Sequence, residues 1–272
     1  MKVIDIHAHA FPDSLAERVI PQLAKEGNIT PALDGTISAL LASMDRAGVE
    51  QSVICSILTR PEQFEPVMRW SETIASDRIG PFGSIHPADP KAADRVKEIA
   101  AEGMLGIKMH PFYQDFVIDE DRMIPIYEAA EAAGLIMLLH AGHDVAYAPH
   151  DRATPVRTRR VIERFPGLRL IAAHIGGWQE WDAVERHLVG QPVYMDLSWS
   201  LPMMDQAQAL RILTSHPTEY LVFGTDSPWA DQAEAVAEFM ALGLPEDLSS
   251  AILYDNAARL LTEAATTVLK GS

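Results

Sequence analysis

The chain has 272 residues, of which 48% are hydrophobic, and a formal net charge of -16. This length suits one barrel-sized domain over residues 1–272, and the negative charge argues against a nucleic-acid partner, whose phosphates it would repel. The single cysteine, Cys55, excludes an internal disulfide, and no apolar run approaches the roughly 18 residues that span a bilayer. We therefore expect a cytoplasmic protein without a membrane or nucleic-acid partner.

Short apolar runs alternate with longer amphipathic stretches along the chain. The runs predict strands over 2–8, 51–58, 80–86, 104–110, 135–140, 168–174, 192–197 and 220–225. The stretches predict helices over 36–48, 61–76, 90–102, 121–133, 155–165, 178–188, 204–215 and 230–242, and a last helical segment over 255–265 that we expect to pack outside. This alternation favours an α/β fold, a (β/α)8 TIM barrel with an extra C-terminal helix. A doubly wound open sheet is the alternative, although no Gly-x-Gly-x-x-Gly motif follows the first strand.

Titratable side chains stand where the predicted strands end. In a barrel, functional residues gather at the carboxyl ends of the strands. A hydrogen-bonded structural role would explain any one of these residues, but it does not explain why so many share this position. They are His7 and His9 on the first strand, His86 on the third, Lys108 and His110 on the fourth, His140 on the fifth, His174 on the sixth and Asp226 on the eighth.

The pair His7-x-His9 is the first candidate for metal binding. Residues two apart on a strand point the same way, about 7 Å apart, so both imidazoles can converge on one ion. Together with His140 and Asp226, the pair would supply three nitrogen ligands and one carboxylate and leave an open position for water on Zn²⁺. The ion would lower the pKa of that water toward ~7, so hydroxide would be available at neutral pH.

Motifs spread over nearly the whole chain resemble those of the metal-dependent amidohydrolase superfamily, in its "amidohydrolase 2" branch. That branch includes aminocarboxymuconate semialdehyde decarboxylase and related decarboxylases, hydratases and lactonases. The matching segments are Ile4-Asp5-Ile6-His7-Ala8-His9, Met44-Asp45-Arg46-Ala47-Gly48-Val49, Gly106-Ile107-Lys108-Met109-His110-Pro111, His174-Ile175-Gly176-Gly177, Gly224-Thr225-Asp226-Ser227-Pro228 and Asp255-Asn256-Ala257-Ala258-Arg259-Leu260-Leu261.

The resemblance implies roles for the residues at the strand ends. It implies that His7, His9 and His140 bind metal. Asp226 would be a ligand that also holds the reactive water, and His174 would be the general acid/base or, alternatively, a ligand of a second metal.

Residues of the fourth strand leave two alternatives open. Lys108 occupies a place comparable to the carboxylated lysine that bridges two metals in some binuclear amidohydrolases. In relatives with one metal, residues of this strand often hold substrate, and for Lys108 and His110 we favour either such a role or one in supporting the metal ligands. Arg60, in a predicted loop at the same end, could bind a substrate carboxylate or be an ordinary surface residue.

These residues lead to three hypotheses about function. We expect first a hydrolase that attacks a small carboxylated ester, lactone or amide with a metal-activated water. The alternative is non-oxidative decarboxylation of an aromatic or muconate-type acid, and the third hypothesis is a non-enzymatic metal-binding barrel. The expected cofactor is Zn²⁺, with Mn²⁺ as the alternative, and one ion is favoured over two. The expected partner is a small-molecule substrate, and the resemblance also suggests a homodimer.

Overall fold

Parallel strands form the centre of the protein, which is represented by a computed structural model that describes residues 2–271. Within these residues the strands are β1 (Val3–Ala8), β2 (Val49–Cys55), β3 (Ile79–Ser84), β4 (Gly106–Met109), β5 (Ile136–Leu139), β6 (Arg169–Ala172), β7 (Tyr194–Asp196) and β8 (Leu221–Val222). Each pairs with the next in chain order, from β1 to β8. The N–H of Ile6 donates to the carbonyl oxygen of Phe223 (3.0 Å), so β8 returns to β1 and the barrel is nearly closed. The predicted (β/α)8 fold is confirmed.

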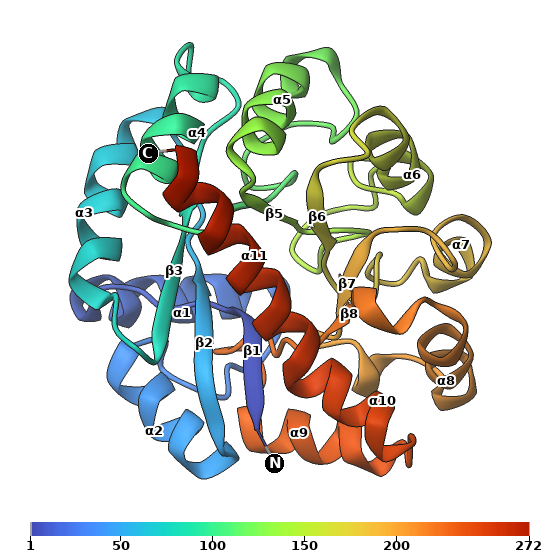
Figure 1. Cartoon of the computed structure of the whole chain (residues 1–272). Coiled ribbons are helices and arrows are strands. Elements are labelled where there is room, and N and C mark those ends of the chain that lie inside the picture. Colours follow the sequence, from blue (N-terminus) through green and yellow to red (C-terminus); the bar gives the residue numbers. More distant parts are fainter. Residues whose placement is uncertain (1, 272) are drawn as a thin grey trace.

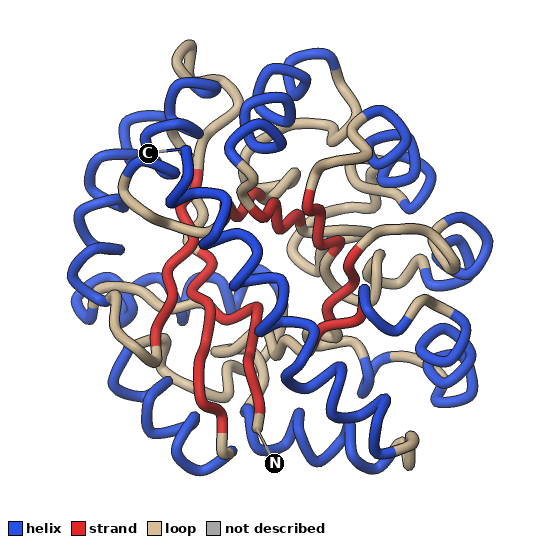
Figure 2. The backbone as a smooth tube through the Cα atoms, in the orientation of Figure 1, coloured by secondary structure: helices blue, strands red, loops and turns tan. Residues whose placement is uncertain are grey.

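Helices surround the strands as an outer ring, except for the last helix, which crosses them (Figure 1 and Figure 2). They are α1 (Asp13–Gly27), α2 (Ile37–Ala47), α3 (Phe64–Ile74), α4 (Ala92–Ala101), α5 (Ile124–Ala133), α6 (Pro155–Arg164), α7 (Trp181–His187), α8 (Gln206–Ser215), α9 (Gln232–Ala241), α10 (Glu246–Ser250) and α11 (Asn256–Gly271). Short 3-10 turns lie at Pro61–Gln63, Asp121–Met123, Leu201–Met203 and Thr218–Tyr220, and a π turn at Ala251–Asp255 leads into α11. None of the helices in the described part of the chain is both long and apolar enough to cross a membrane.

Side chains of each strand alternate between the barrel interior and the layer under the helices. On β5, Ile136 and Leu138 belong to the interior cluster, whereas Met137 and Leu139 pack under the helices. All four are buried, and burying a side chain of this size contributes about 1.5–3 kcal/mol. Because both faces of the strands are covered, the strands read as continuous apolar runs in the sequence.

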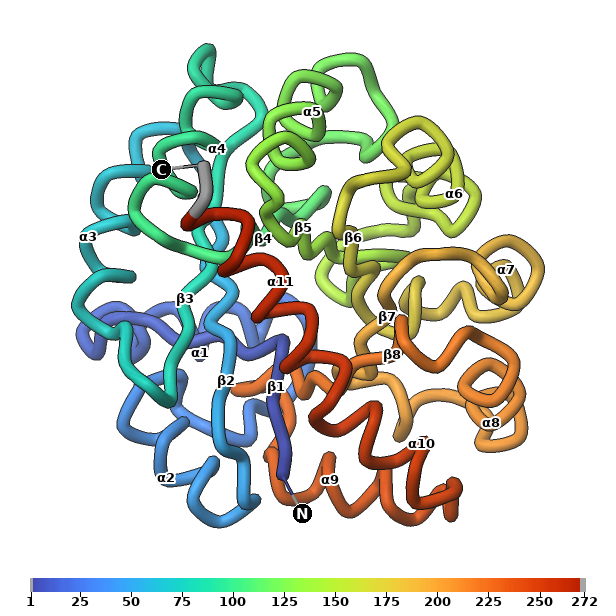
Figure 3. The backbone as a smooth tube through the Cα atoms, in the orientation of Figure 1, coloured from blue at the N-terminus to red at the C-terminus, as the bar shows by residue number. Residues whose placement is uncertain are grey.

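The last helix, α11, differs from our expectation that it packs outside. It crosses in front of the strands in the view of Figure 1 and Figure 3. Its residues Ala257, Leu260, Leu261 and Ala264 belong to the same apolar cluster as the interior side chains of the strands. The helix therefore covers the amino end of the barrel, and the opposite end is left for the functional residues.

Helix α1 has no counterpart among the predicted elements. It lies between β1 and α2, contains Pro21 and buries Ala16 and Ile20. Its C-terminal residues, which include Leu23 and Gly27, line the pocket at the carboxyl end of the barrel.

Candidate active site

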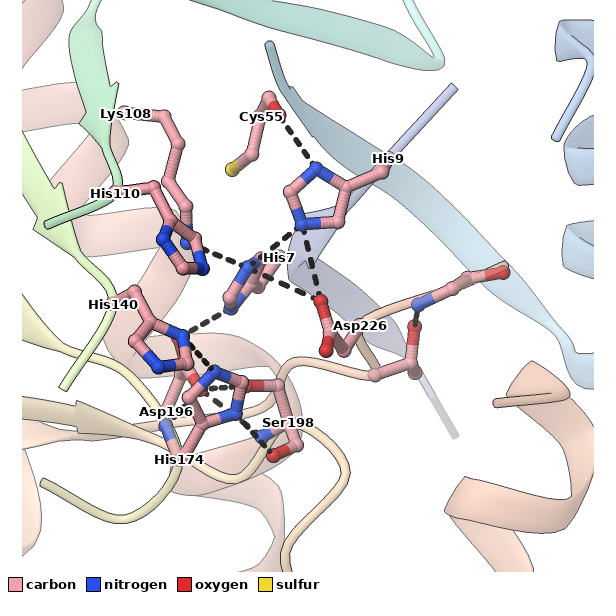
Figure 4. A network of polar contacts seen from close by, with 12 residues as sticks. His7, His9, Cys55, Lys108, His110, His140, His174, Asp196, Ser198 and Asp226 are labelled. Atoms are coloured by element: carbon pink, nitrogen blue, oxygen red, sulfur yellow. Dashed lines mark hydrogen bonds and ion pairs between the residues drawn. The ribbon is translucent and has the colours of Figure 1, made fainter. Parts of the chain in front are cut away.

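Three of the predicted ligands converge at the carboxyl end of the barrel. The Nε2 atoms of His7 and His9 lie 3.2 Å apart. Oδ1 of Asp226 is 3.4 Å from the first of these nitrogens and 3.1 Å from the second. Figure 4 shows the three side chains turned toward one another. These atoms form a group that could hold a metal ion, which we call the His7/His9/Asp226 triad.

A change of register in β1 brings His7 to the interior. The pairing of β1 with β2 shifts between Asp5 and Ala8. As a result Ile6, which belongs to the interior cluster, and its neighbour His7, which lines the pocket, both face the inside of the barrel. Strict alternation would have turned one of them outward. His9 then follows His7 on the same side, as the His-x-His spacing predicts.

Hydrogen bonds to the outer nitrogens set the tautomers of the two histidines. Nδ1 of His7 lies 3.0 Å from Oδ2 of Asp196, and Nδ1 of His9 lies 2.6 Å from the carbonyl oxygen of Cys55. A carbonyl or an ionised carboxylate only accepts, so both Nδ1 atoms carry the proton and both Nε2 atoms are bare. Metal-binding histidines are held in this way by their second ring nitrogen. The donor set therefore fits a divalent cation.

Burial and charge favour the ligand forms of these groups. Burial, helped by the charge of Lys108, lowers the pKa of His7 to about 4, so the ring is neutral at pH 7. Burial alone would raise the pKa of Asp226, but its electrostatic interactions with the His7 and His9 rings outweigh burial and hold the pKa below its ordinary value. An ionised carboxylate beside two bare nitrogens attracts a cation.

His140 and His174 form a second pair beside the triad. Nε2 of His140 lies 2.8 Å from the carbonyl oxygen of His143, and Nδ1 of His174 lies 3.0 Å from that of Ser198. Both of these nitrogens must donate, so His140 Nδ1 and His174 Nε2 face each other bare at 3.0 Å. Two facing lone pairs are stable only beside a cation, which can be a proton or a metal ion. The structure thus places Nδ1 of His140 next to His174, and the role of His140 as a metal ligand stays a prediction.

The residues of β4 lie at the floor of the same pocket. Nζ of the buried Lys108 donates to Nε2 of His7 over 2.8 Å, and burial lowers the pKa of this lysine. His110 stacks on His140 with ring centroids 4.1 Å apart, and its Nε2 lies 3.3 Å from Oδ2 of Asp144. His110, His140 and Asp144 form a second group of potential ligand atoms, but the hydrogen bond of His140 to a carbonyl already occupies one of its nitrogens.

Two candidates from the sequence lie elsewhere. Arg60 is exposed at the start of the Pro61–Gln63 turn, and neither it nor His86 belongs to the described residues that line the pocket. Sequence reasoning also missed two contributors, Asp196 and Ser198, which contact His7 and His174. Asp196 ends β7, so the strand-end rule that selected Asp226 could have selected it as well.

The pocket above these residues has a polar floor and largely apolar walls. The triad, Lys108 and His174 lie among its lining residues. The wall residues are Phe11, Leu23, Ile29, Ile57, Tyr113, Val145, Trp178, Trp199 and Trp229. Trp178 stacks on Trp199 with ring centroids 5.1 Å apart and planes only 8° from parallel, so part of the wall is flat.

A comparison with protein-family models identifies the family. The model described as "Amidohydrolase" matches residues 4–262. The chain belongs to the amidohydrolase family. It is an enzyme of that superfamily, whose members bind a divalent metal, and the triad is the candidate site for such an ion in this chain. The resemblance seen in the motifs is thereby confirmed. Among curated proteins, none matched the chain.

Solved structures with the same fold include proteins of unknown and of known activity. An uncharacterized TIM-barrel protein from Bordetella bronchiseptica is 22% identical, with a TM-score of 0.79, and the match covers 97% of this chain and 99% of that one. The 5-carboxyvanillate decarboxylase of Sphingomonas paucimobilis is 18% identical, with a TM-score of 0.69 and coverage of 96% and 99%. The corresponding enzyme of Novosphingobium aromaticivorans, complexed with manganese and 4-hydroxy-3-methoxy-5-nitrobenzoic acid, is 16% identical, with a TM-score of 0.71 and coverage of 96% and 96%.

Proposed function

We propose that the chain is a metal-dependent decarboxylase of a small aromatic or otherwise unsaturated carboxylic acid. The observation that carries this proposal is the division of one pocket into a polar floor and flat apolar walls. Such walls suit the ring of an aromatic acid, and Lys108 in the floor, together with a cation held at the triad, would suit its carboxylate. Two structural neighbours with named activities are decarboxylases of an aromatic acid, which supports the same substrate class.

We propose further that one divalent ion is held by His7, His9 and Asp226, with His140 as a fourth ligand. Zn²⁺ is our first choice and Mn²⁺, which one neighbour binds, is the alternative. A cation bound there would supply a Lewis acid that withdraws charge from the oxygens of the substrate. Lys108, the buried cation of the floor, would pair with an anionic oxygen of the substrate.

In the proposed step the residues of the chain transfer one proton to the substrate. The bond between the substrate carbon and its carboxyl group breaks, the electron pair stays on that carbon, and CO₂ leaves. His174, protonated on Nε2 as well as on Nδ1, supplies from Nε2 the proton that replaces the carboxyl group. Nδ1 stays bonded to Ser198, so the neutral ring that is left keeps its proton there. The hydrolysis that we expected first from the sequence has less support, since the named activities of the solved neighbours are decarboxylations.

Isotope labelling of substrates distinguishes the two reactions. The Zn²⁺- or Mn²⁺-loaded protein is incubated in D₂O with aromatic and muconate-type acids labelled with ¹³C in the carboxyl group. We expect release of ¹³CO₂ and one deuterium on the carbon that lost it. A parallel panel of lactones, esters and amides is incubated in H₂¹⁸O. Incorporation of ¹⁸O into an opened product, without CO₂ release from any acid, would show that the chain is a hydrolase instead.

His174→Asn tests the proton donor. Loss of a general acid typically lowers kcat by about 10²–10⁴-fold, and we expect such a loss with the Zn²⁺ content unchanged. His187→Asn, at the end of α7 and outside the residues lining the pocket, is the matched control and should retain activity. An active His174→Asn variant would remove this residue from the mechanism.

A further inference from the structure

One buried carboxylate contacts both halves of the site. Asp196 is fully buried at the end of β7. Its Oδ2 accepts from Nδ1 of His7 at 3.0 Å. Its Oδ1 accepts from the backbone N–H of His174 at 3.1 Å and from that of Ser198 at 3.0 Å. The hydroxyl of Ser198 also donates to Oδ1.

Ser198 extends this carboxylate to the ring of His174. Its Oγ and its carbonyl oxygen each lie 3.0 Å from Nδ1 of His174. Because the hydroxyl hydrogen is directed to Asp196, the lone pair of Oγ is left for the ring. Nδ1 of His174 must therefore donate, and a continuous chain of hydrogen bonds runs from His174 through Ser198 and Asp196 to His7 (Figure 4).

We propose that Asp196 is a positioning residue that sets the tautomers of His7 and His174 together. It holds Nδ1 of His7 as a donor and, by orienting Ser198, it does the same for His174. In both rings this leaves a bare Nε2 for the reacting centre. The part that concerns His174 rests on the proposed function, whereas the part that concerns His7 needs only a cation at the triad.

The effect of a mutation at this position follows from its hydrogen-bond partners. Asn is nearly the same size as Asp, but one side of its amide donates. In Asp196→Asn the amide nitrogen must face either His7 Nδ1–H or the N–H groups of His174 and Ser198. When it faces His7, the ring has to move its proton to Nε2, where the proton blocks the metal position.

Asp5 offers a matched control. It too is fully buried and accepts several hydrogen bonds, from the backbone N–H of His7 and Thr225 and from the side chains of Thr225 and Gln232. In the described structure none of its hydrogen bonds goes to an imidazole ring. A loss caused only by a disturbed buried carboxylate would appear in Asp5→Asn as well.

NMR of the metal-free protein with ¹⁵N-labelled histidine reads the tautomers directly. In the wild type we expect both His7 and His174 to carry their proton on Nδ1; a proton on Nε2 of either neutral ring would overturn the proposal. In Asp196→Asn we expect His7 to change to the Nε2–H form. In Asp5→Asn the His7 ring should stay as it is in the wild type.

Titration with Zn²⁺ gives the second measurement. We expect the affinity of Asp196→Asn to fall about 10–100-fold and that of Asp5→Asn to change much less. Equal losses in the two variants, or no loss in Asp196→Asn, would contradict a positioning role. If Asp196→Asn does not fold, the tautomers of His7 and His174 in the wild type still test the proposal. None of these measurements uses a substrate, so failure to find decarboxylation would leave the result for His7 intact and would count against the proposed function alone.

Discussion

Single residues of this site adopt backbone conformations that L-amino acids rarely take. His174, Ile175 and Asp226 have φ angles of 61°, 51° and 64°. Each such conformation costs of order 1–3 kcal/mol and persists only where the surroundings hold it. Here the indole N–H of Trp181 donates to the carbonyl oxygen of His174 (3.1 Å), and the N–H of Asp226 donates to the carbonyl oxygen of His7 (2.7 Å). The strained residues are thus tied to the elements that carry their partners.

Gly142 shows how closely the backbone is packed around His140. Its φ is +81°, and a Cβ added to it would overlap the backbone N and O of Trp178, neither of which can move away. We expect Gly142→Ala to lower the free energy of unfolding by about 3 kcal/mol or more, because it combines this overlap with a left-handed conformation. Urea denaturation measures the change.

Gly190→Ala is the control for Gly142→Ala. Gly190 has the same kind of backbone conformation, with a φ of +83°, but an added Cβ would meet nothing within 4 Å. It should lose only about 1 kcal/mol, the typical cost of the left-handed conformation. Equal losses in the two variants would mean that close packing at Gly142 does not matter.

For single residues, the sequence predicts which side chains belong to the site better than it predicts their hydrogen-bond partners. His7, His9, His174 and Asp226 could be selected because they end strands and parallel strands end at one face. The hydrogen bond from His9 to the carbonyl oxygen of Cys55 could not be predicted, because every residue has a carbonyl and the sequence does not show which one His9 contacts. Likewise the contact between His140 and His174 depends on side-chain rotation that strand periodicity does not determine.

Among the elements, helix α6 is attached to the segment after β4 by a charged cluster. Asp119 accepts hydrogen bonds from two arginines of α6, Arg157 and Arg160, the second with an N–O distance of 3.0 Å. Burial alone would raise the pKa of Asp119, but the hydrogen bonds of Arg160 and Arg157 outweigh it and lower the pKa below its ordinary value. The ionised carboxylate is thus the form that holds the helix.

We expect Asp119→Asn to lower the free energy of unfolding by about 1 kcal/mol at pH 7, since Arg160 is exposed and solvent screens its charge. A lowered carboxyl pKa stabilises the fold at every pH above the value of the unfolded chain, about 3.9. The difference between variant and wild type should therefore stay constant from pH 7 to 5 and shrink below pH 4. Denaturation curves at several pH values measure it. Asp94→Asn, which breaks only an exposed pair with Lys97, should behave as the wild type, and a similar loss there would contradict the argument.

The periodic elements were the easiest part of the fold to predict. Every predicted strand overlaps an observed one, because buried parallel strands are short apolar runs that differ clearly from amphipathic helices. Helix α1 was not predicted, because Pro21 stands in its interior and a proline normally ends a helix in sequence reasoning. Its place over the pocket depends on tertiary contacts.

For the molecule as a whole, buried histidines predict how stability depends on pH. Burial lowers the pKa of His7 to about 4, lowers those of His110 and His140 far below 6.5, and lowers that of His216. Below pH 6.5 the unfolded chain binds protons that the folded chain does not, so stability falls as the pH drops. Asp5 has the opposite effect, because burial raises its pKa to about 6 and the folded chain therefore binds this proton at a higher pH than the unfolded chain.

We expect the free energy of unfolding of the metal-free protein to fall between pH 6.5 and 5 by more than the effect of a single proton, about 1.4 kcal/mol per pH unit. Urea denaturation of the chelator-treated protein at half-unit steps gives the slope. A flat profile over this range would show that the buried rings accept protons without unfolding.

The whole-molecule feature that the sequence did not predict is the position of α11. Its amphipathic pattern fits a helix of the outer ring equally well, and only the open amino end of the barrel selects its actual place. This position determines how molecules travel through the protein. With the amino end covered, substrate must enter and product must leave at the carboxyl end of the barrel, where the pocket lies. Substrate binding and product release then use the same end of the pocket, so a bound product prevents the next substrate from binding. We expect the product to inhibit competitively.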